Sequence, residues 1–212
     1  MSNRLVIVSG TGTGVGKTWV ARGLARLLLR RGLEVAVRKP VQSFDPDDGP
    51  TDAALLAAAT GESEDSVCPL HRSYGLPMAP PMAADALGLA GLNLADLVAE
   101  LVLPRKGVAI VEGVGGPRSP LAHDADTVAL AEALAADAVL LVAPSGLGAI
   151  NDVLLARSAF GERNIAVYMN RFDSADQVHS ANRRWLEARL PHVHTNLESL
   201  AGVVAGELMV PG

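Results

Sequence analysis

The segment VIVSGTGTGVGKTWVARGL, from Val6 to Leu24, carries the residues best suited to bind phosphate. An apolar run leads into a glycine-rich loop, and Lys17 and Thr18 follow where a helix is expected to begin. Glycines let several backbone N–H groups face one anion, and the helix start adds its positive end. Lys17 supplies a charge for the β- and γ-phosphates, and the Thr18 hydroxyl is a hard oxygen ligand for Mg²⁺. The segment therefore predicts a nucleotide site.

The loop differs from the consensus sequence of the common phosphate-binding loop, in which four residues separate a first glycine from the Gly-Lys-Ser/Thr ending. Thr11 occupies the place of that first glycine, and the nearest upstream glycine, Gly10, leaves five residues before Gly16. This spacing favours a subfamily whose phosphate-binding loop has a modified sequence. A glycine-rich turn without a ligand is one alternative. A dinucleotide-binding turn is a poorer one, because it does not need Lys17 and Thr18 and no acid follows the second expected strand.

Polar residues at other element ends could complete the site. Lys39 follows the second expected strand and would lie beside the phosphate loop if the two strands are neighbours, although a solvated lysine is the alternative. Glu112 ends a buried apolar run, the place of the second metal-site carboxylate in many phosphate-loop enzymes. Asp52 follows Thr51 at a helix start, where capping alone could explain it. With Thr18, the two carboxylates form a plausible oxygen-ligand set for Mg²⁺.

Two later segments offer further ligand groups. Gly146 and Gly148 frame a helix start after the fourth expected strand and leave N–H groups for an anion, although a plain strand–turn–helix is the alternative. Asn170 closes the fifth strand, and its amide can pair with a purine edge because it offers a donor and an acceptor together. Trp19 is expected to pack. Cys68 lacks a nearby partner that would mark it as a nucleophile.

The elements that position these residues alternate along the chain. Apolar runs predict strands at Leu5–Gly10, Glu34–Pro40, Val108–Gly113, Ala138–Ala143 and Ile165–Asn170. Helices are expected between and after them, at Trp19–Arg31, Thr51–Thr60, Leu94–Leu101, Thr127–Ala135, Ala149–Phe160 and Ser180–Leu190. This alternation predicts an α/β fold, a single domain over residues 1–212 with a mostly parallel sheet covered by helices on both faces. Ligands bind such sheets at the carboxyl ends of the strands, where the polar residues lie.

Two segments carry weaker patterns. Prolines in Cys68–Pro81 make a long helix or strand unfavourable there, so we expect a structured surface loop within the domain. The segment from Pro191 onward is expected to hold one more strand and a short closing helix.

Composition excludes several classes of protein. The chain has 212 residues, 49% of them hydrophobic, which suits one sizeable core and excludes a disordered chain. The formal net charge of −5 argues against nucleic-acid or anionic-membrane binding, although a loop can still bind phosphate with its local field. No apolar run reaches the roughly 18 residues of a membrane span. Because there is one cysteine and no apolar signal segment, we expect a cytoplasmic protein.

Taken together, these segments resemble the dethiobiotin synthetase family. The stretch VSGTGTGVGKTWVARGLARLLLRRGLEVAVRKPVQS is similar to the family's N-terminal segment, including its spacing of five residues before Gly16. The other similar segments follow in family order: TDA (Thr51–Ala53), PMAPPMAA (Pro77–Ala84), VEGVGG (Val111–Gly116), GLGAIN (Gly146–Asn151) and MNR (Met169–Arg171). The resemblance extends over Leu5–Leu190.

The resemblance implies a P-loop NTPase-like fold and an ATP-dependent ligase that forms C–N bonds in biotin biosynthesis. In that family 7,8-diaminononanoate takes up CO₂ on one amine as a carbamate. ATP phosphorylates the carbamate, and the second amine closes the cyclic urea of dethiobiotin. The resemblance also implies ATP and Mg²⁺ as cofactors, and a homodimer with its sites near the subunit interface.

The resemblance further implies a role for each matching residue. Lys39, Lys17 and Thr13 take catalytic roles, and Thr18, Asp52 and Glu112 are the metal ligands. The implied nucleotide contacts, with Asn170 reading the adenine, are Gly14, Val15, Gly16, Lys17, Thr18, Trp19, Asp52, Glu112, Gly113, Val114, Gly115, Asn170 and Arg171. The implied diamine contacts are Thr13, Lys39 and Ser43, with Gly146, Leu147, Gly148, Ala149, Ile150 and Asn151 receiving the carboxylate tail of the neighbouring subunit's substrate.

Four positions depart from the family's pattern. Gly14 stands where some relatives have an acid, and Val114 where alanine is usual. Arg171 follows the amide where an aspartate is often found, which bears on base selectivity. Asn182 stands where an aromatic ring would shelter the diamine.

Three rival functions follow from the same loop. A ParA- or MinD-like ATPase switch would carry an extra lysine early in the loop, where this chain has Gly12. A ligase acting on a corrinoid precursor usually carries a glutamine-handling domain, for which this chain has no room. A binding module that has lost its chemistry would not need Lys17, Thr18, Lys39, Asp52 and Glu112 together.

Overall fold

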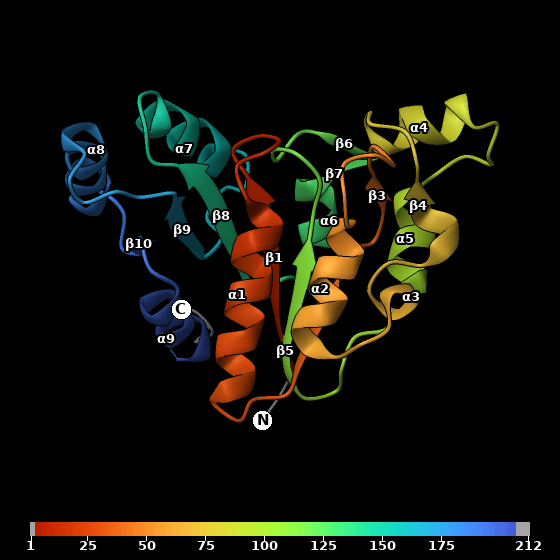
Figure 1. Ribbon diagram of the computed structural model, residues 1–212, viewed down its shortest axis with the longest axis horizontal. Helices are drawn as coiled ribbons and strands as arrows, with labels where there is room; N and C mark the ends of the chain where they lie inside the picture. Colours follow the sequence, from red (N-terminus) through yellow and green to blue (C-terminus); the bar gives the residue numbers. More distant parts are fainter. Residues whose placement is uncertain (1–2, 207–212) are drawn as a thin grey trace.

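The computed structural model describes residues 3–206, which form a parallel β-sheet between two layers of helices (Figure 1). The sheet has six strands in the order β10-β9-β8-β1-β5-β2, and every pair in it is parallel. The strands are β1 (Asn3–Gly10), β2 (Val35–Arg38), β5 (Gly107–Glu112), β8 (Ala138–Pro144), β9 (Ile165–Asn170) and β10 (Val193–His194). The predicted α/β fold is confirmed.

Both faces of the sheet are buried, which explains why its strands are apolar without alternation. In β1, Val6 and Val8 belong to one core cluster, and Leu5 and Ile7 belong to the other. Successive side chains of a strand point to opposite faces, so a strand covered on both sides must be apolar at every position. Two cores therefore share one sheet.

The helices divide between these two cores. The first core is covered by α1 (Lys17–Arg30), α2 (Asp52–Thr60) and α9 (Leu197–Ala205), with Val67 from the short α3 (Glu64–Val67). The second core is covered by α4 (Pro80–Ala86), α5 (Leu94–Glu100), α6 (Thr127–Ala133), α7 (Ala149–Ser158) and α8 (Gln177–Glu187). None of the helices within residues 3–206 has the length and apolar character to cross a membrane.

Smaller elements lie in the connections. The pair β3 (Gln42–Ser43) and β4 (Ser73–Tyr74) is parallel, and the pair β6 (Pro120–Ala122) and β7 (Ala125–Asp126) is antiparallel. A single 3₁₀ turn, η1, covers Leu70–Arg72.

The differences from the predicted elements lie at their ends and in the proline-rich segment. Helix α8 begins at Gln177 rather than Ser180, because the Asp176 side chain accepts from the N–H groups of Val178 and His179 and starts the helix early. The segment Cys68–Pro81 is less irregular than predicted, since it holds η1, β4 and the start of α4. Of its prolines, Pro80 and Pro81 occupy the first turn of α4, where a missing N–H costs nothing. The weak C-terminal pattern did correspond to a strand and a closing helix, β10 and α9.

Strand order decides which residues can meet. Strand β1 lies between β5 and β8, and β2 lies beyond β5 at the edge of the sheet. Lys39 therefore does not follow a direct neighbour of β1, as one interpretation of the sequence required. It follows the strand beyond β5 and must reach across the end of β5, where Glu112 lies opposite Val8 in the register.

Candidate functional site

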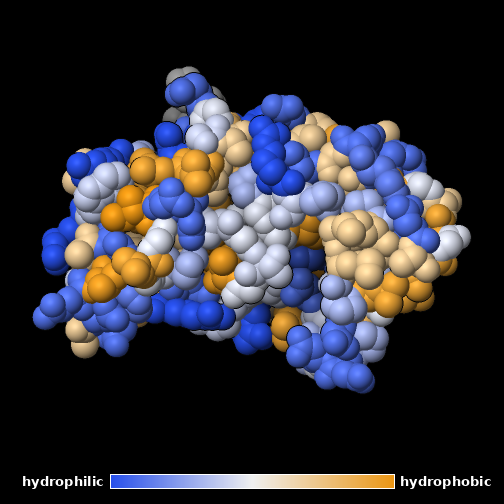
Figure 2. Space-filling view, turned by 90° about the horizontal axis from the view of Figure 1, so that it is seen from above, coloured by the Kyte–Doolittle hydropathy of each residue, from blue (hydrophilic) through white to orange (hydrophobic). Residues whose placement is uncertain are grey.

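A cavity of about 660 Å³ opens at the carboxyl ends of β1, β2 and β5. It brings together many residues predicted for the site: Thr13, Gly14, Gly16, Lys17, Thr18, Lys39, Ser43, Asp52, Glu112, Val114 and Gly115. Figure 2 looks down on this end of the molecule, where pale surface of intermediate hydropathy lies at the centre and apolar surface gathers to both sides. The cavity is the candidate active site.

The phosphate loop owes its shape to three glycines. Gly14 and Gly16 have φ values of 73° and 96°, in the left-handed region that other residues avoid. A side chain on Gly10 would meet the carbonyl oxygens of Gly12 at 2.6 Å and Gly115 at 3.0 Å. Gly10 also donates its N–H to the Gly115 carbonyl at 3.3 Å. A glycine is therefore required at position 10, because the phosphate loop itself and the loop that follows β5 both approach its Cα closely.

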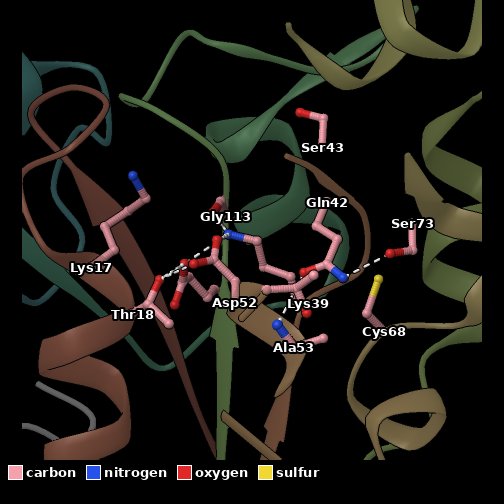
Figure 3. A network of polar contacts seen from close by, with 12 residues as sticks. Lys17, Thr18, Lys39, Gln42, Ser43, Asp52, Ala53, Cys68, Ser73 and Gly113 are labelled. Carbon is pink, nitrogen blue, oxygen red and sulfur yellow. Dashed lines mark hydrogen bonds and ion pairs between the residues drawn. The ribbon is translucent and has the colours of Figure 1, made fainter. Parts of the chain in front are cut away.

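Lys17 curls back onto this loop. Its Nζ donates to the carbonyl of Gly12 at 3.3 Å and points away from the carboxylates of the site (Figure 3). Burial lowers the pKa of Lys17, and the positive charge of Lys39 lowers it further. The ammonium group is thus held among backbone groups of the loop that is expected to bind phosphate.

Four side chains from different elements meet at the end of β5 (Figure 3). The Nζ of Lys39 lies 2.7 Å from Glu112 Oε1 and 2.8 Å from Asp52 Oδ2, and donates to the carbonyl of Gly113 at 3.1 Å. The Thr18 hydroxyl lies 2.6 Å from Asp52 Oδ1 and 2.9 Å from Glu112 Oε1. The predicted metal ligands are therefore brought together, with Lys39 between the two carboxylates.

This oxygen cluster suits a divalent cation. The Thr18 hydroxyl has one hydrogen but contacts oxygens of two carboxylates, so it can donate to only one of them. Glu112 Oε2 is buried and has no hydrogen-bond partner among residues 3–206. Hydroxyl and carboxylate oxygens of this kind are ligands that Mg²⁺ accepts beside water and phosphate. The residues present therefore fit the metal that the resemblance implies.

Electrostatics fix Lys39 as a cation. Burial would lower the pKa of Lys39, but the attraction of Glu112 and Asp52 outweighs it and holds that pKa above its usual range. For Asp52, burial opposes ionisation, and the charge of Lys39 still holds the pKa of the carboxyl below its usual value. Burial raises the pKa of Glu112, against the opposing charge of Lys39. A lysine held in this way stays protonated at neutral pH, so it can neutralise anions but does not act as a proton donor or acceptor in the reaction.

Gln42 positions one of these carboxylates, and sequence reasoning gave it no role. Its Oε1 accepts from the N–H of Ala53 at 3.0 Å, and its Nε2 donates to Ser73 Oγ at 2.8 Å. Thr51 caps the same helix by accepting from Ala54 N at 3.1 Å. Gln42 thereby ties β3 to the first turn of α2, which carries Asp52. No pattern marked this residue, because a single glutamine after a short strand has no characteristic spacing.

A second cavity, of about 360 Å³, lies on the other side of the phosphate loop and is lined by Gly16, Trp19, Tyr168, Asn170, Arg171, Phe172 and Thr195. Asn170 Nδ2 donates to the carbonyl of Val15 at 2.9 Å. Arg171, with a φ of 56°, donates to the carbonyl of Gly14 at 3.3 Å. Trp19 is 49% exposed, so the expectation that it packs in the core is wrong. The cavity brings together Asn170, Arg171 and Trp19, three residues to which the resemblance assigns nucleotide contacts.

The predicted turn Gly146–Asn151 lines neither of these two cavities. It leads into α7 and includes the first residues of that helix, Ala149–Asn151, with Gly148 at a φ of 92° and Leu147 open to solvent at 95% exposure. Asn182, noted in the sequence only for replacing an aromatic residue, is buried beneath this turn. Its Nδ2 donates to the carbonyls of Ser145 and Gly146 at 3.0 and 2.8 Å.

The chain is similar to proteins of known name over most of its length. Residues 4–195 match the model of a family described as an AAA domain. The ATP-dependent dethiobiotin synthetase BioD of Anaeromyxobacter dehalogenans (strain 2CP-C) is 36% identical over 196 residues, which cover 89% of this chain and 86% of that protein. The same enzyme of Mycolicibacterium gilvum is 33% identical over 211 residues, covering 95% and 90%. That of Methylobacterium nodulans is 41% identical over 166 residues, covering 71% and 72%.

Solved structures share the fold at much lower identity. A plasmid partition protein from Borrelia burgdorferi bound to AMPPNP has a TM-score of 0.57 and 13% identity, over 94% of this chain and 90% of that one. The signal recognition particle receptor FtsY from Elizabethkingia anophelis has a TM-score of 0.53 and 15% identity, over 98% and 65%. These likenesses establish a P-loop NTPase-like architecture and nothing finer. The sequence relatives go further, and the chain belongs to the dethiobiotin synthetase family.

Proposed function

We propose that this chain catalyses the ATP-dependent closure of a cyclic urea from a vicinal diamine and CO₂, the dethiobiotin synthetase reaction. The observation that carries the proposal is the buried Lys39 at the end of β5, held between two carboxylates beside a phosphate loop. Membership of the family supplies the substrate, 7,8-diaminononanoate.

The reaction has three bond changes. One amine of the diamine attacks CO₂ and loses a proton, which gives a carbamate. A carbamate oxygen attacks the γ-phosphorus of ATP, ADP leaves, and a carbamic–phosphoric mixed anhydride forms. The second amine attacks the carbamate carbon, loses a proton and expels inorganic phosphate, closing the five-membered ring. The difficult encounter is that of the anionic carbamate with the anionic γ-phosphate, which requires cations between them.

The lysines of the site are assigned to this encounter. Lys39 is a permanent cation in the cavity and neutralises the carbamate and the phosphoryl group as charge moves between them. Lys17 is assigned to the β- and γ-phosphates. Thr13 and Ser43 line the same cavity, and we assign them to the diamine and carbamate. This division gives one lysine to the nucleotide and one to the reacting group.

Thr18, Asp52 and Glu112 would hold Mg²⁺. When bound, the metal supplies positive charge to the phosphate oxygens, as in other phosphate-loop enzymes. Two observations support this assignment. Glu112 Oε2 has no hydrogen-bond partner among the described residues, and the Thr18 hydroxyl contacts oxygens of both carboxylates. Gly113 supports it indirectly, because its carbonyl holds Lys39 beside Glu112.

The second cavity is assigned to the nucleotide base. The orientation of the Asn170 amide follows from its bond to Val15, because a carbonyl accepts only from the NH₂ group. The remaining Nδ2 hydrogen and Oδ1 then match N7 and N6 of adenine. Trp19 offers a ring for stacking, and Gly14, Val15 and Gly16 connect this cavity to the phosphates. Arg171 holds the loop at Gly14 on the cavity's rim.

We also propose a homodimer in which the turn Gly146–Asn151 serves the neighbouring subunit. The turn lies outside the cavity of its own subunit, which supports a role in the partner's site. Exposed apolar side chains are present in the turn itself at Leu147, on α7 at Leu155 and on α8 at Val178. Apolar surface of this kind is typical of subunit contacts.

Residues 1–212 would form one synthetase domain in the cytoplasm, a location that the free thiol of Cys68 suits.

The proposal is tested by measuring phosphate release with and without 7,8-diaminononanoate and bicarbonate, with mass spectrometry of the product. Phosphate release that requires both, together with a product of the mass of dethiobiotin, is the expected result. Phosphate release indifferent to the diamine would instead favour an ATPase switch of the partition-protein kind and overturn the proposal.

A further inference from the structure

Asn182 is a buried polar residue on α8 whose side chain serves neither the nucleotide nor the metal. Both hydrogens of its Nδ2 are used, one on the carbonyl of Ser145 and one on that of Gly146. The carbonyl of Gly146 also accepts from Ala149 N at 3.2 Å, the bond that begins α7. Asn182 therefore holds the two residues from which the turn Gly146–Asn151 departs.

A continuous set of hydrogen bonds extends from Asn182 to the phosphate loop. The Ser145 hydroxyl donates to the carbonyl of Asn170 at 2.8 Å, and Asn170 Nδ2 donates to the carbonyl of Val15 at 2.9 Å. Ser145 and Asn170 are both buried. The ends of β8 and β9 and the phosphate loop are thus fixed to one another by side chains, with Asn182 at the far end.

The turn has donors to offer. Among residues 3–206, the backbone N–H groups of Ile150 and Asn151 have no hydrogen-bond acceptor. Their direction is set by the start of α7, and the start of α7 is set by the Gly146 carbonyl that Asn182 holds. A small rotation of this carbonyl would re-aim the N–H groups, because no side chain caps α7.

We infer that Asn182 is a positioning residue for the carboxylate end of the diamine, acting through the turn Gly146–Asn151. The inference rests on the proposed function, in which that turn receives the carboxylate. Asn182 does not touch the substrate. It keeps two carbonyls turned inward so that the N–H groups of the turn face outward to the anion.

The test is steady-state kinetics of Asn182→Asp, which keeps the shape of the side chain and removes both donors. We expect KM for diaminononanoate to rise about tenfold or more, as the loss of one to two net hydrogen bonds implies, with kcat and KM for ATP changed less than about twofold. Gln177→Glu is the matched control, because it makes the same change of charge at an exposed position of α8. The control is expected to behave like the wild type.

A second substrate separates positioning from general damage. The analogue 2,3-diaminononane keeps the chain and both amines and lacks the carboxylate. If Asn182 acts through the turn, wild type and Asn182→Asp should use this analogue equally poorly, within about twofold, since the lost interaction is absent from both. A variant that was merely misfolded would lose activity with both substrates.

Three outcomes would overturn the inference. These are an unchanged KM for diaminononanoate, equal losses toward ATP and the diamine, or equal losses with and without the carboxylate. If Asn182→Asp does not fold, Asn182→Ala takes its place with the same two substrates. A wild-type protein that formed no cyclic urea would count against the proposed function itself, and this result is distinct from any failure of the variants.

Discussion

Lys39 and Glu112 form a buried ion pair of 2.7 Å across the end of β5, although Lys39 follows β2 and the helices α2 to α5 lie between β2 and β5 in the chain. Their side chains are 3% and 1% exposed, so neither charge is compensated by water. Lys39 depends on both Glu112 and Asp52 for its charged state, whereas Glu112 depends on Lys39, because burial and the charge of Asp52 both raise the pKa of Glu112. The pair explains how a lysine can remain a cation in a cavity that must also receive two anions.

Replacing this lysine should separate catalysis from nucleotide binding. We expect Lys39→Ala to lower turnover far more than ATP affinity, because Lys39 stabilises charge that develops during transfer. The free energy of unfolding should also fall by about 3–5 kcal/mol, since Glu112 is left buried with Asp52 and no cation. Steady-state kinetics, nucleotide titration and chemical unfolding measure the three quantities. Equal losses in turnover and affinity would contradict the transition-state role, and exposed Lys106→Ala is the control.

Glu112→Gln should weaken magnesium-dependent nucleotide binding. The amide keeps the shape of the side chain but presents one oxygen without a formal charge, a poorer ligand for a hard cation. In a titration with Mg²⁺ at fixed nucleotide, the midpoint should move to higher Mg²⁺ concentration. Glu132→Gln, at an exposed position of α6, should leave the midpoint unchanged. An unaltered titration would remove Glu112 from the metal ligands.

Trp19 should report nucleotide binding by its fluorescence. It lines the second cavity and is half exposed, so a stacked base will exclude water from its ring. We expect a non-hydrolysable ATP analogue to change the emission, and Trp19→Phe to abolish that change while Trp185 continues to emit. A signal that survived in Trp19→Phe would place the base elsewhere.

Cys68 should be inert in the folded protein. Burial raises the pKa of its thiol to about 12, so the reactive thiolate is scarce at neutral and mildly alkaline pH. Alkylation followed by mass spectrometry should show slow modification in buffer and rapid modification in urea. Rapid labelling of the native chain would show that the region around α3 opens without global unfolding.

His123 should make stability depend on pH. Its Nδ1 lies 2.8 Å from the carbonyl of Leu92 and its Nε2 lies 2.9 Å from Asp85 Oδ1. The Leu92 carbonyl, and then Asp85, raise the pKa of His123 above its unfolded value. The stabilisation is therefore complete below the unfolded pKa and is lost as pH rises through the folded pKa. His123→Gln should lower Tm more at about pH 5.5 than at about pH 8.5. An equal loss of Tm at both pH values would show that the charge of His123 does not contribute to stability.

Sequence reasoning located the strands and most of the site because the strand ends carry distinctive residues. Thr18, Asp52 and Glu112 were grouped by their places at element ends, and they do meet. The strand order was not accessible, since periodicity does not say which strands are neighbours, and Lys39 was predicted beside the phosphate loop only on the condition that the first two strands are neighbours. Gln42 escaped notice because its role depends on a contact with α2. The buried position of Asn182 depends in the same way on how α8 packs.

The order of the strands also bears on protein synthesis. Strands β1 and β2, together with Lys17 at the start of α1 and Lys39 after β2, leave the ribosome well before β5, which lies between the two strands in the sheet. Until residue 112 has been translated, Lys39 has no Glu112 to pair with, and the edge of β1 that β5 will occupy remains open. A chain ended before β5 should therefore fail to assemble the nucleotide site and present an unpaired edge to chaperones.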